Sequence, residues 1–224
     1  MKHAGLIRLV ATVVVIVFAL GIWATGGKPD LGWLRFYSAA VLIATALLWL
    51  WETLLWKIRP AQHFRAVPRD VSGTWKGTLE SLWKASETGT SPARMAAYLV
   101  VRQTASTVSV VLLTNESRSA SSLGSVSTGL DTPTLDYMYL NRPDPRFENQ
   151  SRMHHGSTQL DITGQPATRL RGRYWTDRNS RGELDFVERT KHKADDFEQA
   201  ASLFKPSTAN SRPARRSQPR LRDL

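Results

Sequence analysis

Aromatic, amide and cationic side chains recur at every second position in two segments of this sequence. Tyr137, Tyr139 and Asn141 share one face of a short segment, and Tyr98 and Arg102 share one face of another. Aromatic faces, an amide and a guanidinium together suit a flat-ringed, negatively charged ligand. If these faces turn inward, they form an aromatic and cationic lining. The predicted ligand-binding residues are Tyr98, Arg102, Tyr137, Tyr139, Asn141 and Tyr174.

Each of these residues also has a structural interpretation. A tyrosine on a strand usually packs in a core, and an isolated arginine is usually a solvated surface charge. Between residues 169 and 176, Leu170 and Tyr174 alternate with Arg171 and Arg173, so only one set can face inward. The apolar set is expected inside, which places Arg171 and Arg173 outside.

The sequence contains no recognisable catalytic or metal-binding signature. It has no cysteine, GxSxG elbow, P-loop or HExxH motif, which excludes a Cys nucleophile and thiolate zinc sites. His154 and His155 are adjacent, so on a strand they point to opposite faces and cannot bind one metal ion together. Asp195 and Asp196 fall in an expected surface helix rather than a pocket. We therefore expect no enzyme, no metal and no cofactor.

Two uncharged segments near the N-terminus predict a helical hairpin in a membrane. Leu9–Thr25 and Phe36–Trp51 contain no charged residue, and each covers about 25 Å as a helix, most of a hydrocarbon core of roughly 30 Å. Transmembrane helices are expected at about 6–25 and 36–56, within a unit over 1–59. No A-x-A cleavage site follows the first segment, which argues against a signal peptide. Ala40 and Ala44 give the second helix a small face on which helices can pack closely.

Tryptophans and basic residues flank these two segments. The flanking tryptophans are Trp23, Trp33, Trp49, Trp51 and Trp56, and their rings prefer the headgroup region. Lys2, Arg8, Lys57, Arg59, Arg65 and Arg69 lie outside the hairpin, whereas Lys28 and Arg35 lie between its helices. This bias predicts that both termini are cytoplasmic.

Beyond a linker expected at 60–70, hydropathy alternates with a period of two. Eight strands are expected at Val71–Trp83, Ala96–Thr104, Thr107–Thr114, Arg118–Thr128, Leu135–Asn141, Met153–Thr163, Arg169–Thr176 and Gly182–Arg189. The connections are too short for crossover helices, and Thr176–Glu183 has the composition of a hairpin turn. The sequence predicts an all-β, eight-stranded antiparallel up-and-down (lipocalin-like) barrel over 71–190. Such a barrel is either filled or able to hold one small ligand.

Gly73, Trp75 and Gly77 form a structural motif on the inward face of the first strand. The glycines permit a bend and a close backbone approach, which leaves room for the Trp75 indole to plug one end of the barrel.

The C-terminal region has a different composition. A short helix is expected over 191–204. Residues 205–224 hold six basic residues (Lys205, Arg212, Arg215, Arg216, Arg220 and Arg222) against Asp223. With few large apolar side chains, this tail is expected to be disordered. It is either simply solvated or in contact with an anionic leaflet or, nonspecifically, nucleic acid. No specific nucleic acid partner is expected.

The whole layout resembles the two-transmembrane, β-strand-rich effectors of bacterial cyclic-oligonucleotide anti-phage signalling (CBASS). The resemblance rests on the two apolar segments, on "VSGTWKGTL" and on "GRYWTDRNSRGELDF", and spans about Gly5–Arg189. It implies that a cyclic dinucleotide, made by a cGAS-like nucleotidyltransferase after phage infection, binds the barrel. The effector would then form a homo-oligomer and disrupt the lipid bilayer of the bacterial inner membrane, and the cell would die.

One alternative is a membrane-anchored lipocalin-like binding or scaffold protein whose barrel holds a lipid or a protein partner. The character of the barrel interior distinguishes the two. Polar lumen residues favour a nucleotide, and a wholly apolar lumen favours a lipid.

Overall fold

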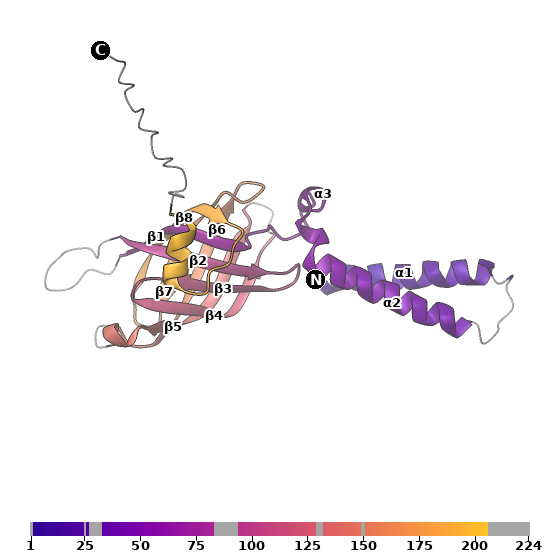
Figure 1. The fold of residues 1–224 in the computed structure, drawn as a ribbon, viewed down its shortest axis with the longest axis horizontal. Helices are drawn as coiled ribbons and strands as arrows, with labels where there is room; N and C mark the ends of the chain where they lie inside the picture. Colours follow the sequence, from indigo (N-terminus) through magenta and orange to yellow (C-terminus); the bar gives the residue numbers. More distant parts are fainter. Residues whose placement is uncertain are drawn as a thin grey trace, which may run out of the picture.

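The computed structural model describes residues 2–24, 26, 33–82, 94–128, 132–148 and 151–205, with side chains in the first two helices described at 11–23 and 38–53. The chain begins with α1 (Lys2–Ala24) and α2 (Trp33–Thr53), which lie side by side at one end of the molecule (Figure 1). The short turns η1 (Leu55–Lys57) and α3 (Arg59–Gln62) follow. After the strands, α4 (Phe197–Leu203) lies against the outside of the barrel.

The eight strands close into a single barrel. They are β1 (Gly73–Ser81), β2 (Met95–Gln103), β3 (Val108–Leu113), β4 (Ser117–Val126), β5 (Thr134–Pro143), β6 (His154–Thr163), β7 (Arg169–Thr176) and β8 (Arg181–Thr190), with the turn η2 (Pro145–Phe147) after β5. Each strand pairs antiparallel with the next, and β8 pairs with β1. The predicted eight-stranded up-and-down barrel is confirmed. Closure leaves no unpaired strand edge among these eight.

The two N-terminal helices pack through small residues. Ala40 and Ala44 are almost completely buried, which agrees with the small face expected on the second helix. The helix ends at Thr53, before the expected residue 56. Trp56 instead lies buried in η1, where its Nε1 donates a hydrogen bond to the Glu52 carbonyl at 3.1 Å. Among the described residues, no helix combines the length and apolarity needed to cross a membrane.

Large apolar side chains fill the half of the barrel next to the helices. The fully buried members are Trp75, Leu99, Leu135, Leu160, Leu170, Leu184 and Phe186. The Trp75 indole nitrogen donates to the Val71 carbonyl at 2.9 Å, so the buried ring keeps its hydrogen bond. Gly73 has a φ of 127°, and a Cβ there would collide with the Thr190 carbonyl. The inward Trp75 and the close backbone approach at Gly73 were both predicted.

The predicted inward orientation of Tyr98 and Arg102 is wrong. Both faces of β2 carry apolar residues, so alternation alone does not decide which face is inside. The aliphatic face is inside, and α4 covers the other: the Tyr98 ring lies 5.3 Å from Phe197 and 5.9 Å from Phe204, between centroids. Arg102 pairs on the outside with Asp195 at 2.9 Å.

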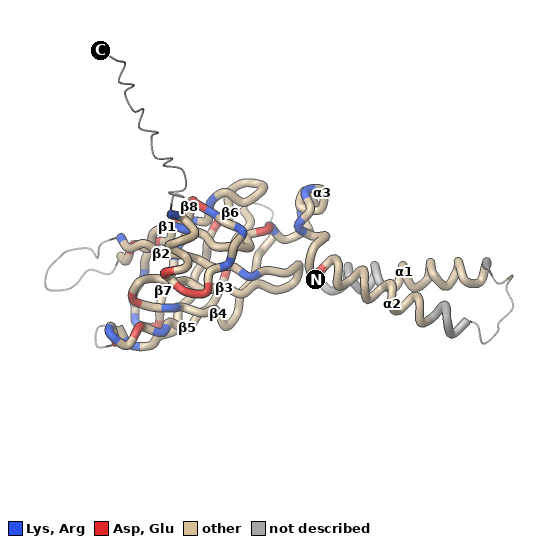
Figure 2. Tube along the Cα trace, in the orientation of Figure 1, with Lys and Arg blue, Asp and Glu red and all other residues tan. Residues whose placement is uncertain are grey.

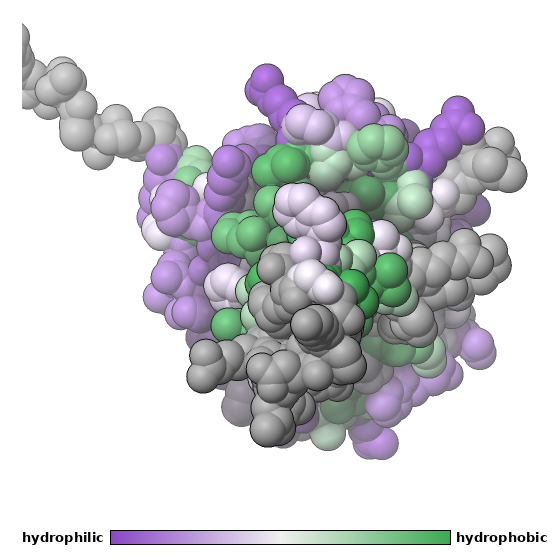
Figure 3. Space-filling view, turned by 90° about the vertical axis from the view of Figure 1, so that its right-hand side faces the viewer, coloured by the Kyte–Doolittle hydropathy of each residue, from purple (hydrophilic) through white to green (hydrophobic). Residues whose placement is uncertain are grey.

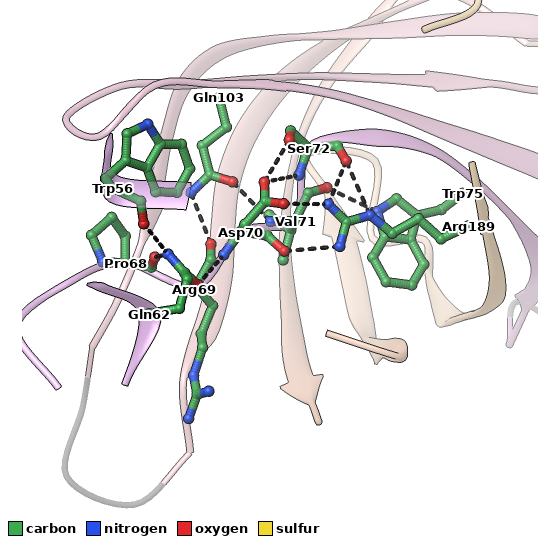
Figure 4. A network of polar contacts seen from close by, with 10 residues as sticks. All are labelled: Trp56, Gln62, Pro68, Arg69, Asp70, Val71, Ser72, Trp75, Gln103 and Arg189. Carbon is green, nitrogen blue, oxygen red and sulfur yellow. Dashed lines mark hydrogen bonds and ion pairs between the residues drawn. The ribbon is translucent and has the colours of Figure 1, made fainter. Parts of the chain in front are cut away.

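A network of polar contacts seals the end of the barrel next to the helices (Figure 4). The Gln103 side chain accepts from the Val71 amide and donates to the Arg69 carbonyl, both at 2.9 Å. Because the Val71 amide bonds to a side chain, β1 begins at Gly73 rather than at Val71. Arg189 Nη2 bonds to Asp70 Oδ2 at 2.8 Å, and its guanidinium lies 5.2 Å from the Trp75 ring centroid.

Candidate ligand site

A cavity opens at the end of the barrel away from the helices. Its volume is about 480 Å³, within the range of about 300–1,000 Å³ typical of small-molecule sites. The described lining residues are Leu79, Ser81, Met95, Leu112, Thr114, Glu116, Ser117, Ser119, Tyr139, Asn141, His154, Thr158, Tyr174, Arg178 and Ser180. Most of them carry a hydroxyl, an amide, an imidazole or a charge. The lumen is therefore apolar near the helices and polar at the open end.

Two glycines keep this half of the lumen open. Tyr139 on β5 is paired in register with Gly156 on β6, and Tyr174 on β7 with Gly182 on β8. A Cβ on either glycine would collide with the neighbouring tyrosine ring. Each ring therefore lies against the barrel wall, in space that any other residue would occupy. Two phenol rings line the cavity without filling it.

A chain of polar side chains crosses the wall between β4, β5 and β6. Ser119 Oγ donates to Asn141 Oδ1 at 2.9 Å, and Asn141 Nδ2 lies 3.4 Å from His154 Nδ1. These contacts hold the amide of Asn141 in one orientation. An oriented amide can read the hydrogen-bonding edge of a heterocyclic base.

Two hydroxyls are buried without a hydrogen-bond partner in the described part of the chain: that of Thr158, which lines the cavity, and that of Tyr137, which lies deeper in the core. Burial raises the pKa of Tyr137 well above its ordinary value, and the nearby Thr158 hydroxyl opposes that rise. The geometry between the two groups nevertheless satisfies neither hydroxyl. Unsatisfied buried hydroxyls cost stability and are good partners for a ligand or water that enters the cavity.

The tyrosines of the cavity are neutral at physiological pH. Burial raises the pKa of Tyr139 and, to a lesser extent, that of Tyr174. Neutral phenols donate hydrogen bonds and offer ring faces, but they are poor nucleophiles and bases. The arrangement is suited to binding.

The acidic and basic residues at the mouth of the cavity are Glu116 and Arg178, respectively. Arg178 Nη1 donates to the Arg152 carbonyl at 3.3 Å and forms no ion pair with a described residue. Its guanidinium is thus available to an anionic group at the rim, such as a phosphate.

Two other hollows lie on the outside of the barrel and are less suited to a small ligand. One, of about 780 Å³, lies between α4 and η2, where Arg118 already donates to the Asp195 carbonyl and Arg146 pairs with Asp144. The other, of about 290 Å³, is a shallow groove beside the exposed Leu123, Met138 and Trp175. The larger hollow holds Arg142 beside Phe147 and Phe197, but it lies outside the barrel, and the smaller groove has no Lys or Arg among its lining residues.

The structure brings together half of the six residues predicted to bind ligand. Tyr139, Asn141 and Tyr174 line the cavity, whereas Tyr137 is buried deeper in the apolar core, and Tyr98 and Arg102 are outside. Arg171 and Arg173 are exposed on the wall, as the alternation of β7 predicted. Whether the lining residues bind a ligand stays a prediction.

Sequence reasoning missed several lining residues, among them Ser119, His154 and Arg178. His154 faces the cavity and His155 is exposed, so their alternation was predicted even though the role of His154 was not. The inward serines of β4 had a usable signal in their alternation with Arg118 and Ala120. Arg178 had none, because it lies in the turn between β7 and β8.

Comparison with known proteins now identifies the family. The family described as "Cap15, cyclic dinucleotide receptor domain" matches residues 66–188, slightly more than half of the chain. This chain belongs to the Cap15 family. The Cap15 match begins just before β1 and ends within β8, so it contains the whole lining of the cavity. It ends before α4, so Asp196, Phe197 and Glu198, which line the larger outer hollow, lie outside the matched region.

A curated relative supports the Cap15 assignment. The chain is 28% identical over 183 residues to CD-NTase-associated protein 15 of Staphylococcus schleiferi. The alignment covers 82% of this chain and 95% of the relative, so it extends beyond the barrel into the region of the helices. The Cap15 family description names a receptor domain rather than an enzyme.

Proposed function

We propose that this protein is a CBASS effector whose barrel binds a cyclic dinucleotide in the cavity away from the helices. The observation that carries the proposal is the polar and aromatic cavity inside a domain of the Cap15 receptor family. A cyclic dinucleotide offers two phosphates and two flat bases. Tyr139 and Tyr174 present ring faces for the bases, Asn141 presents an amide, and Arg178 presents a charge for a phosphate.

The polarity of the lumen favours a nucleotide over a lipid. A lipid carrier needs a cavity that is apolar along the acyl chain, whereas most of the residues that line this cavity carry polar side chains. The apolar half of the barrel is filled by its own side chains and offers no space to an acyl chain. The cyclic dinucleotide would come from a cGAS-like nucleotidyltransferase, as the CBASS resemblance implies.

The proposal places the N-terminal hairpin in the bacterial inner membrane, with both termini in the cytoplasm. It is supported by the uncharged runs Leu9–Thr25 and Phe36–Trp51, by the flanking tryptophans and by the excess of basic residues outside the hairpin. Ligand binding would shift the population toward a homo-oligomer whose assembled hairpins breach the bilayer. A single hairpin has no polar face with which to line a pore, so many copies are required.

Binding is tested on the full chain in detergent micelles with a panel of cyclic dinucleotides, by thermal shift and calorimetry. We expect one of them to stabilise the protein, and Tyr139→Ala and Asn141→Ala each to weaken its affinity about tenfold, the loss expected for a stacking or hydrogen-bonding group. Arg102→Ala is the matched control, because this residue lies outside the barrel. No stabilisation by any cyclic dinucleotide, or a lipid found in the cavity of the purified protein, would refute the proposal.

The membrane output is tested separately in vesicles that contain the full chain and a trapped dye. Addition of the bound cyclic dinucleotide should release the dye, and cross-linking should show assembly at the same ligand concentration. A protein that binds ligand but neither assembles nor releases dye would be a receptor without the proposed effector step.

A further inference from the structure

The segment between α2 and the barrel, residues 54–69, carries a net positive charge; we call it the junction segment. It contains Lys57, Arg59, Arg65 and Arg69 and no Asp or Glu. None of these four side chains forms an ion pair with a described residue, whereas six arginines beyond the junction segment do: Arg94, Arg102, Arg146, Arg169, Arg171 and Arg189. Figure 2 shows the contrast, with Lys and Arg at α3 and both signs of charge across the strands. The positive charge of the junction segment is therefore not neutralised within the described protein.

Apolar side chains are exposed in the same segment. Leu54 is 57%, Ile58 49% and Phe64 68% exposed. Exposed apolar groups interspersed with cations that form no ion pair are typical of segments that lie at a membrane surface, where the apolar groups enter the acyl boundary and the cations contact phosphates. In the view along the helices, hydrophobic residues gather around the centre and hydrophilic ones lie toward the periphery (Figure 3).

The junction segment is folded onto itself by hydrogen bonds, and it is tied to the loop between β6 and β7 by the Gln165 side-chain amide, which donates to the Gln62 carbonyl. Gln62 Nε2 donates to the carbonyls of Trp56 at 2.7 Å and Pro68 at 3.0 Å, and its Oε1 accepts from the Asp70 amide at 3.1 Å (Figure 4). Trp56 and Val67 are buried on the side that packs inward. With this inner side fixed, Phe64 and its basic neighbours cannot turn inward to bury their apolar surface.

The last turn of α2 fixes the segment next to the end of the helices. The Glu52 carboxylate accepts hydrogen bonds from the Ser106 amide at 3.0 Å and from the hydroxyls of Ser106 and Thr104 at 2.5 Å. These bonds tie the end of α2 to the turn between β2 and β3. The junction segment therefore lies at the level where α2 meets the barrel.

We infer that the junction segment is a binding surface for anionic phospholipid headgroups. The inference rests on the proposed membrane position of the hairpin and adds the chemistry of the lipid that the protein contacts. Lys57, Arg59 and Arg65 attract the headgroup phosphates, while Ile58 and Phe64 enter the boundary between headgroups and acyl chains. This surface fixes the barrel against the bilayer, with the mouth of the cavity turned toward the cytoplasm.

The test uses the full chain in nanodiscs of phosphatidylcholine alone or of an equal mixture with phosphatidylglycerol. Amide hydrogen exchange of residues 54–69 should be severalfold slower in the anionic discs, and high salt should remove the difference. The triple variant Lys57→Gln/Arg59→Gln/Arg65→Gln should show no difference in exchange between the two kinds of disc. The control Arg142→Gln/Arg173→Gln/Arg181→Gln removes the same charge from exposed arginines that form no ion pair with a described residue, and should keep it.

Further measurements distinguish a failure of the headgroup surface from a failure of the proposed membrane position or of the receptor site. Equal exchange in both discs, or a difference that survives in the triple variant, overturns the headgroup surface. Slowing by inorganic phosphate in phosphatidylcholine discs also overturns it, since the site would then bind free phosphate. Phe64→Ser should weaken the protection without changing exchange in the strands. A chain that does not enter the discs refutes the membrane position itself, and cyclic dinucleotide protection around Tyr139, measured in the same discs, reports on the receptor site independently.

Discussion

At the end of the barrel next to the helices, Trp75 and Arg189 close the interior, whereas at the other end Tyr139 and Tyr174 lie flat against the wall and leave it open. At the closed end most polar groups are satisfied within the protein: the Trp75 indole bonds to Val71, and Arg189 bonds to Asp70, whereas Arg69 Nη1 is buried without a described partner. The open end leaves the Thr158 hydroxyl buried without a described partner. One end is built for stability, and the other retains polar groups that a ligand can use.

The difference also bears on how a bound ligand would affect the helices. The two N-terminal helices lie at one end of the barrel (Figure 1). The residues that line the cavity lie at the other end, and the filled apolar core lies between. A ligand at the mouth cannot contact the helices directly. Its effect would have to pass through the strands or through contacts between neighbouring barrels, which agrees with an output by assembly.

The largest effect is expected from opening the closed end with Trp75→Ala. Trp75 is fully buried in the core, and replacing such a residue with alanine typically costs about 3–5 kcal/mol. The free energy of unfolding of the barrel, measured by urea titration of the full chain in micelles, should fall by that amount. Tyr174→Ala at the open end is the comparison, because its ring is only partly buried, and it should cost clearly less. Equal costs would show that the two ends do not differ in packing.

Asp70 at the closed end should give the barrel a pH-dependent stability. Burial works against the charged form, but hydrogen bonds from Ser72 and the nearby Arg189 guanidinium lower the pKa of Asp70 below its ordinary 3.8. A carboxyl whose pKa is lower in the folded state than in the unfolded state stabilises the fold fully at pH values above its unfolded pKa. This stabilisation is lost as the pH falls through its folded pKa. Asp70→Asn should therefore destabilise the barrel at neutral pH by about 2 kcal/mol and flatten the decline in stability below about pH 4.

A matched control for Asp70 is Asp195→Asn. The Asp195 side chain also pairs with an arginine but is 78% exposed, and exposed pairs contribute little. Its unfolding curve should match that of the wild type at neutral pH. If both variants lose the same stability, the buried position of the Asp70 pair is not what matters.

The barrel and its closed end could be predicted from the sequence, but the candidate site could be predicted only in part. Alternation over eight segments predicted the topology, and the glycines around Trp75 predicted the plug. Alternation does not give depth along a strand, so Tyr137 and Tyr139 looked equivalent although one is in the core and the other lines the cavity. It also failed for β2, where Tyr98 is as apolar as the inner residues and is covered by α4.

At the open end, Gly156→Ala should displace the Tyr139 ring from the barrel wall into the cavity. The added methyl group would collide with the end of the Tyr139 side chain, the closest contact, and push that ring into the lumen, and it would also lie 2.9 Å from the Trp175 carbonyl oxygen. Affinity for the cyclic dinucleotide should fall about tenfold, or about 1.4 kcal/mol, measured by calorimetry. The double variant Gly156→Ala/Tyr139→Ala should bind no more weakly than Tyr139→Ala alone, because the displaced ring is then absent. Additive losses would show that Gly156 acts independently of the tyrosine.

The smallest effect on the free energy of unfolding is expected from Thr158→Val. Thr74→Val is its comparison, because the Thr74 hydroxyl has hydrogen-bond partners and the Thr158 hydroxyl has none among the described residues. The Thr158 hydroxyl at the open end is buried without a described partner, so replacing it with an isosteric methyl group should leave the free energy of unfolding unchanged or raise it by up to about 1 kcal/mol. Thr74, near the closed end, is also fully buried, but its hydroxyl donates to the His192 carbonyl at 2.8 Å and accepts from the Ala194 amide at 3.0 Å. Thr74→Val should therefore cost about 1–3 kcal/mol, because two backbone groups lose their partner. A similar loss in both variants would mean that the Thr158 hydroxyl is satisfied by water, and that the open end is no less stable in its polar contacts than the closed one.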